Sequence, residues 1–82
     1  MNDDKATTLG DLQTGHRARI TGFTDASASY RRKLLAMGLT PGAELSVTRL
    51  APMGDPVEIS VRGFAMSLRR GEAVAVLVEK IS

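Results

Sequence analysis

Hydrophobic and polar residues alternate most regularly in the second half of the chain. Every second residue is apolar in two five-residue runs, Val57–Val61 and Phe64–Leu68. A period of two is typical of a strand with one buried face. Only Arg62 and Gly63 separate the runs, and such a break is typical of a tight hairpin because glycine readily adopts positive φ. The pattern predicts a β-hairpin whose apolar side chains, Phe64 among them, face the core.

Three other segments also have strand patterns. Residues 16–23 and 44–50 alternate apolar and polar side chains, so each is predicted to be a strand with one solvated face. Their inward-facing residues are predicted to be Ala18, Ile20, Leu45 and Val47. Residues 74–81 are apolar on nearly both faces, which is typical of a strand buried within a closed or folded-over sheet.

One segment has the period of an amphipathic helix. In residues 28–37, apolar side chains recur at i, i+4 and i+7 and form one stripe. The stripe consists of Tyr30, Leu34 and Met37. Either Asp25 or Ser27 is positioned to cap the first turn. Two shorter helical turns are predicted at 8–12, where Leu9 and Leu12 would pack on the core, and at 69–72.

Glycine and proline mark the turns. Gly38 follows the helix and is expected to be its left-handed C-cap, with Leu39 making the accompanying hydrophobic contact. Asp55 is expected to accept backbone hydrogen bonds that fix a proline-rich loop. Structural turn or loop roles are predicted for Gly38, Pro41, Gly42, Gly54, Asp55, Pro56 and Gly63.

Together these elements predict a mainly β domain. About five short antiparallel strands, with one helix between the first two, are best accommodated by a small, partly open barrel that limits exposed edges. An SH3-like barrel fits the strand lengths and the tight hairpin; an OB-like barrel is the alternative. Residues 1–6 are expected to form a flexible tail, and residues 7–82 a single domain.

Composition narrows the function. The 82 residues contain no cysteine, 11 basic and 9 acidic side chains, so disulfides and thiol chemistry are excluded and the net charge is only +2. No apolar run approaches the roughly 18 residues of a membrane helix. We therefore expect a soluble cytoplasmic domain.

The chain offers few groups for catalysis or metal binding. His16 is the single histidine, and the acidic residues are scattered without the spacing of a metal loop. Nucleotide-binding and hydrolase motifs are absent from the sequence. We expect neither an enzyme nor a metal site nor a bound cofactor.

Basic residues gather in two places. Arg31, Arg32 and Lys33 lie on the helix, and Arg69 and Arg70 follow the hairpin. If they met on one face they could hold a phosphate or an acidic partner; the alternative is a solvated surface. Nucleic-acid binding would add exposed aromatic residues, and the three aromatic residues all fall on predicted core positions.

Several motifs, in this order and spacing, resemble the FeoA family of bacterial ferrous iron uptake. They are Leu9-x-x-Leu12-x-x-Gly15, Leu34-x-x-Met37-Gly38-Leu39-Thr40-Pro41-Gly42, Gly54-Asp55-Pro56-Val57, Gly63, Leu68-Arg69 and Glu72-Ala73. The resemblance implies an SH3-like barrel without catalysis of its own. It also implies action with the permease FeoB, which has a cytoplasmic GTP-binding domain.

The same domain occurs in metal-dependent repressors of the DtxR type, so a regulator-type or nucleic-acid-binding module is the alternative function. No winged helix precedes the domain here, which favours a FeoA-type protein. The partner surface is hypothesised to comprise Arg31, Arg32, Met53, Arg69 and Arg70, because Met53 lies in an exposed, proline-flanked loop.

Overall fold

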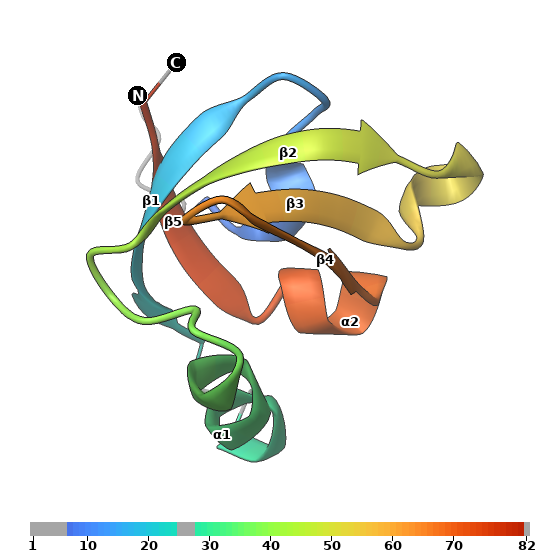
Figure 1. Cartoon of the computed structure of the whole chain (residues 1–82). Helices are drawn as coiled ribbons and strands as arrows, with labels where there is room; N and C mark the ends of the chain where they lie inside the picture. Colours follow the sequence, from blue (N-terminus) through green and yellow to red (C-terminus); the bar gives the residue numbers. More distant parts are fainter. Residues whose placement is uncertain (1–6, 25–27, 82) are drawn as a thin grey trace, which may run out of the picture.

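The computed structural model describes residues 7–24 and 28–81, and its framework is one curled five-stranded sheet (Figure 1). All strand pairs are antiparallel, in the order β4-β3-β2-β1-β5. The strands are β1 (Arg17–Phe23), β2 (Glu44–Leu50), β3 (Val57–Val61), β4 (Phe64–Leu68) and β5 (Val76–Lys80). β4 and β5 are therefore the two edge strands.

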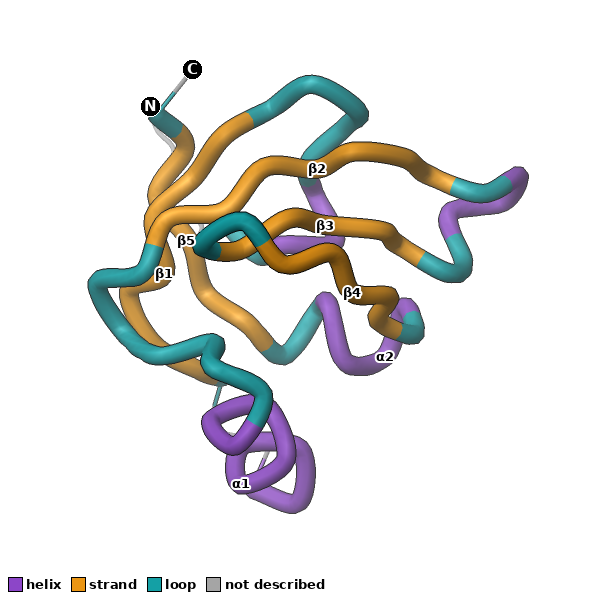
Figure 2. The backbone as a smooth tube through the Cα atoms, viewed as in Figure 1, coloured by secondary structure: helices purple, strands orange, loops and turns teal. Residues whose placement is uncertain are grey.

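Helical segments are short and lie around the sheet. They are η1 (Leu9–Asp11), α1 (Ala28–Ala36), η3 (Pro52–Gly54) and α2 (Arg70–Ala73). Figure 2 shows α1 below the strands and α2 beside the end of β4. None of the helices in the described residues is long and apolar enough to cross a membrane.

The core lies inside the curl of the sheet. The predicted inward residues of β1 and β2 are all buried, and β3 buries every second residue from Val57 to Val61. η1, α1 and the segment before β5 cover it with Leu9, Leu34 and Ala75. The period-two patterns therefore predicted the interior faces of these three strands correctly.

The β3–β4 hairpin has the predicted two-residue turn. Arg62 (φ 53°) and Gly63 (φ 84°) are both left-handed, as a type I′ turn requires, and Val61 pairs with Phe64. The prediction that Phe64 faces the core is wrong, because this side chain is 72% exposed. Burial decreases along β4 from Leu68 through Met66 to Phe64, since a pocket beside the turn end leaves this part of the edge strand uncovered.

The helix ends as predicted. The Leu39 N–H donates to the Leu34 carbonyl and the Gly38 N–H to the Leu35 carbonyl, both at 3.0 Å, which is a Schellman motif. Gly38 occupies the left-handed position with φ 96°. Leu34 and Leu39 are both fully buried, so the helix end is fastened to the core.

Two other side chains lie outside their predicted environment. Tyr30 is 38% exposed rather than buried in the core. Its side chain reaches α2 instead, with the hydroxyl so close to Gly71 that a Cβ added there would lie 3.2 Å away. Val74 is exposed and precedes the last strand, since α2 occupies the chain up to Ala73. The predicted helix caps Asp25 and Ser27, and the predicted tail 1–6, lie outside the described residues.

Candidate partner-binding site

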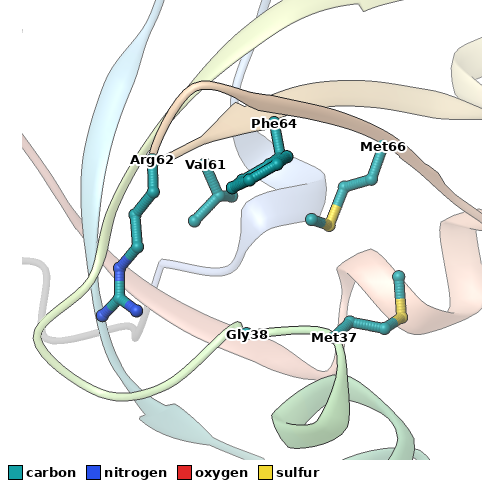
Figure 3. A pocket seen from close by; sticks show the side chains of 6 residues that line it. All are labelled: Met37, Gly38, Val61, Arg62, Phe64 and Met66. Carbon is teal, nitrogen blue, oxygen red and sulfur yellow. The ribbon is translucent and has the colours of Figure 1, made fainter.

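An apolar pocket lies between the β3–β4 turn and the end of α1 (Figure 3). Its volume is about 290 Å³. The lining residues are Met37, Gly38, Val61, Arg62, Phe64 and Met66. Arg62 is the one charged residue in this lining, so the pocket is suited to an apolar side chain with an acidic neighbour.

The local backbone structure positions each wall of the pocket. Phe64 and Met66 lie two residues apart on β4 and therefore project from the same face. The opposite wall is Met37, which the helix end at Gly38 holds in place. In Figure 3 the two methionine side chains lie on either side of the space between the hairpin and the helix. Because methionine is flexible and polarizable, such walls adapt to different apolar partners.

The exposure of Phe64 carries the strongest physical signal. A phenylalanine side chain gains roughly 1.5–3 kcal/mol when it is fully transferred from water to an apolar surrounding. At 72% exposure, Phe64 has most of that gain still available to a partner. Aromatic side chains of this kind dominate the energetics of protein interfaces.

The four predicted partner-binding arginines lie outside this pocket. Arg31 and Arg32 are exposed on α1, and Arg69 and Arg70 are exposed at the start of α2. Among the described residues, no carboxylate lies within ion-pair distance of these four side chains. The structure brings the two helices together, but through other residues.

Glu72 joins the two helices. Its buried carboxylate accepts hydrogen bonds from Lys33 Nζ on α1 and, at 3.0 Å, from the Arg69 N–H at the start of α2. The hydrogen bond from Lys33, followed by that from the Arg69 backbone, lowers the pKa of Glu72 against the opposing effect of burial. Lys33 is thereby paired with a carboxylate of the protein itself.

Met53 lies at the opposite end of β3 from the pocket. It is 92% exposed and has φ 70°, in a tight turn closed by the Gly54 N–H donating to the Ala51 carbonyl at 2.8 Å. A left-handed methionine is strained, so this loop tip remains a second candidate contact. Asp55 Oδ1 accepts a long, 3.4 Å hydrogen bond from the Arg70 N–H, which ties the loop to α2.

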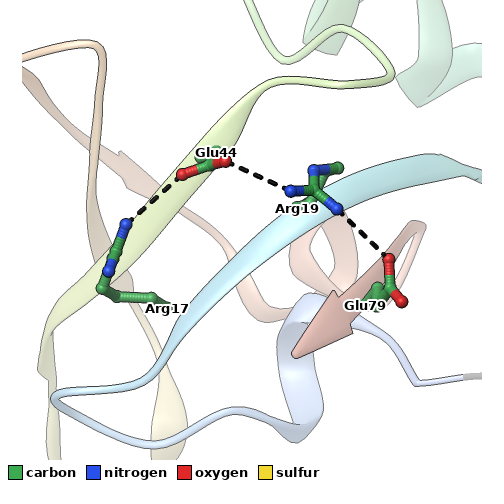
Figure 4. Close-up of polar contacts among 4 residues, drawn as sticks. All are labelled: Arg17, Arg19, Glu44 and Glu79. Carbon is green, nitrogen blue, oxygen red and sulfur yellow. Dashed lines mark hydrogen bonds and ion pairs between the residues drawn. The ribbon is translucent and has the colours of Figure 1, made fainter. Parts of the chain in front are cut away.

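The outer face of the sheet is electrically balanced (Figure 4). Glu44 binds Arg17 at 3.3 Å and Arg19 at 3.4 Å, and Arg19 also binds Glu79 at 3.5 Å. All four side chains are about half exposed, so each pair contributes only about 0.2–1 kcal/mol. These arginines are already paired and form no anion site.

The described residues provide no metal centre. No group of three or more histidine, aspartate or glutamate side chains within residues 7–24 and 28–81 could hold an ion. The Nδ1 atom of His16 accepts a hydrogen bond from the Gln13 N–H at 2.9 Å, which gives this histidine a role in closing its own turn.

Sequence reasoning missed the pocket because its apolar residues were assigned to the core. The available signal was the composition of residues 64–68, which contain no charge although they form the outer strand of a hairpin. Outer strands normally carry charges that prevent edge pairing. An uncharged outer strand directly after a tight turn indicates a contact surface.

Comparison with known proteins identifies the family of this domain. The family model of the FeoA domain matches residues 7–80. A fusion protein of Fe(2+) transport protein A and the Fe(2+) transporter FeoB from Porphyromonas gingivalis is 35% identical over 74 residues. That match covers 90% of this chain and 9% of the fusion protein.

Solved structures share the fold. The NMR structure of a FeoA-like protein from Clostridium acetobutylicum has a TM-score of 0.86 and 34% identity, covering 98% of this chain and 92% of that one. Stenotrophomonas maltophilia FeoA, an SH3 domain protein crystallised with zinc, has a TM-score of 0.78 and 28% identity, covering 90% and 91%. The predicted SH3-like barrel is confirmed.

A manganese-dependent transcriptional repressor also contains this fold. Its TM-score is 0.84 at 16% identity, over 96% of this chain and 43% of the repressor chain. At such low identity the likeness concerns the fold alone, and the similarity to the FeoA proteins is the stronger one.

Proposed function

Because the chain belongs to the FeoA family, we propose that it is a non-catalytic accessory protein that binds FeoB at the cytoplasmic side of the membrane and supports ferrous iron uptake. The observation that carries this proposal is the fusion relative. In that protein a segment similar to this chain is joined to FeoB in one polypeptide. Fusion is a common arrangement for domains that work together, because it raises their effective concentration for one another.

The surface of the domain supports a binding role. The pocket beside Phe64 is apolar and lined by adaptable methionines, and its rim carries the positive charge of Arg62. Such a patch resembles the centre of a protein interface rather than a catalytic site, which needs titratable groups that converge. We assign the contact with FeoB to this pocket.

Co-purification tests the proposal. Detergent-solubilised cognate FeoB should be retained by the immobilised wild-type domain, and Phe64→Ala should reduce the affinity at least tenfold. Thr48→Ala, on the exposed part of β2, is the matched control and should bind as wild type does. If the wild-type domain never retains FeoB, the proposal of direct association is wrong.

A nucleic-acid-binding module is the second candidate, and one observation favours it. Phe64 and Tyr30 are exposed, so aromatic side chains are available for stacking alongside the four exposed arginines of α1 and α2. Binding to duplex or single-stranded DNA would weaken steeply as salt increases. A salt titration that finds no such binding removes this candidate, whereas FeoB binding, which uses the apolar pocket as well as charge, should weaken much less as salt increases.

A further inference from the structure

The β4 edge of the sheet is open to another strand. β4 pairs with β3 on one side and ends the strand order, and Ala65 and Ser67 are exposed. In a hairpin with a two-residue turn, the residues that flank the turn exchange both hydrogen bonds, and pairing then alternates along the ladder. Val61–Phe64 and Ile59–Met66 are thus hydrogen-bonded pairs.

The same alternation identifies the free backbone groups. Ala65 and Ser67 oppose Ser60 and Glu58 at non-hydrogen-bonded positions, so their N–H and C=O groups point away from β3. These two residues offer four backbone hydrogen-bonding groups at the outer edge. An incoming strand can use them without disturbing the hairpin.

The charge around this edge specifies the partner. Residues 64–68 carry no charge, whereas Arg62 lies before them and Arg69 and Arg70 lie after them. A strand added beside β4 would direct every second side chain toward the face that Phe64 and Met66 share, and hence into the pocket. The complementary segment is extended, apolar at alternate positions and acidic at both ends.

We propose that such a segment of FeoB adds to the β4 edge as a sixth strand, inserts one aliphatic or aromatic side chain between Met37 and Met66, and pairs its acidic ends with the flanking arginines. This inference rests on the proposed function, since it takes FeoB as the partner. Backbone pairing supplies affinity in this mode of recognition, and the pocket supplies specificity.

A second copy of this chain fits the edge less well. In an antiparallel pairing of two β4 strands centred on Met66, residue 62 of one copy would lie opposite residue 70 of the other. Arginine would then face arginine at both ends of the paired strands, and like charges directly opposite are destabilising. The charge pattern therefore favours an acidic partner over self-association.

Ser67→Pro tests the backbone pairing. Proline removes the outward N–H and is tolerated on an edge strand where that N–H faces solvent. The matched control, Ser67→Ala, changes the side chain and keeps the N–H. With detergent-solubilised cognate FeoB as the probe, we expect Ser67→Pro to weaken binding at least tenfold and Ser67→Ala to stay within twofold of wild type.

Hydrogen exchange gives a second readout that does not depend on the variant folding. When FeoB binds the wild-type domain, mass spectrometry should detect slower amide exchange across residues 64–68. If FeoB binds the wild-type domain and Ser67→Pro equally, or leaves this exchange unchanged, strand addition is wrong while direct association stands. If FeoB does not bind the wild-type domain, both proposals fail. Loss of dimerisation in Ser67→Pro with unchanged FeoB affinity would instead assign the edge to a second copy.

Discussion

The two edge strands of the sheet, β4 and β5, differ in how far other residues and charges protect them. The β5 edge is partly covered by residues 7 and 8. The Val78 N–H donates to the Thr7 carbonyl at 2.9 Å, and Thr8 forms an isolated antiparallel β-bridge with Leu77. It also carries the charges of Glu79 and Lys80. The β4 edge has exposed residues, Ala65 and Ser67 among them, and no charged residue within the strand.

This difference supports the proposal that a partner binds at the β4 edge. Protection of an edge by a covering segment and by charge is the usual way to prevent unwanted strand pairing. The β5 edge has both devices, whereas the β4 edge has arginines only beyond its ends and an apolar pocket beside it. An edge left open next to an exposed Phe64 is suited to controlled pairing with one complementary strand.

The largest expected effect is a difference in the free energy of unfolding between variants at the covered β5 edge and variants at the open β4 edge. Leu9 is fully buried in the turn that brings the N-terminal segment to β5, so Leu9→Ala should lower the free energy of unfolding by about 2–5 kcal/mol. Phe64→Ala, at the open edge, should change it by no more than about 0.5 kcal/mol. Urea denaturation of both variants measures the contrast, and equal losses would contradict it.

An intermediate effect on the free energy of unfolding is expected at Glu72, beside the open β4 edge. Glu72 connects α2, which follows β4, to α1, which carries one wall of the pocket. Glu72→Gln should lower the free energy of unfolding by about 1–3 kcal/mol at neutral pH, because it weakens a buried, charge-assisted contact. Glu79→Gln, in an exposed ion pair, is the control and should cost less than about 1 kcal/mol.

The pH dependence of that effect has a defined sign. The pKa of Glu72 is lowered in the folded protein, so its contribution is complete above the ordinary carboxyl pKa of about 4.3 and is lost as the pH falls through the lower, folded value. The stability difference between wild type and Glu72→Gln should therefore be constant from about pH 6 to 7 and shrink in acid. A difference that grows in acid would mean that the assigned hydrogen bonds are wrong.

The smallest expected effect has opposite signs in stability and binding. Arg62 has φ 53° in the hairpin turn, a position that asparagine occupies more readily. Arg62→Asn should raise the free energy of unfolding by about 0.5 kcal/mol and weaken FeoB binding several-fold, because the rim of the pocket loses its charge. Arg62→Lys keeps the charge and therefore separates the effect of charge on binding from the effect of turn conformation on stability. If Arg62→Lys weakens FeoB binding as much as Arg62→Asn does, the electrostatic role of Arg62 is wrong.

Local sequence signals predicted the elements well where each signal depends on near neighbours. The hairpin turn at Arg62–Gly63 and the helix end at Gly38 follow from backbone preferences within a few residues. The interior faces of β1, β2 and β3 follow from a period of two, because successive side chains of a strand point alternately toward the core and toward solvent. The motifs spread over the chain also indicated its family, which the match of residues 7–80 confirms.

The site depended on information that no local pattern contains. Alternation assigned Phe64 to the same face as Leu68, and this assignment is correct as geometry. Whether that face is covered at each position depends on what packs against it: Leu68 is buried in the core, whereas a pocket lies beside Phe64. The arginines on the two helices were predicted to contribute to one partner-binding surface. The ion pair that joins the two helices is instead formed by Lys33 and Glu72.

The sequence by itself determined the strands, the turns, the family and the absence of thiol chemistry, because these depend on residue type and short-range spacing. Only the tertiary structure decided which edge of the sheet is covered, which aromatic side chain is exposed and where a pocket forms. These properties arise when segments distant in sequence meet, as the N-terminal turn meets β5 and the end of α1 meets the β3–β4 turn. Packing between distant segments, rather than local preference, turned an ordinary hairpin into the candidate binding surface.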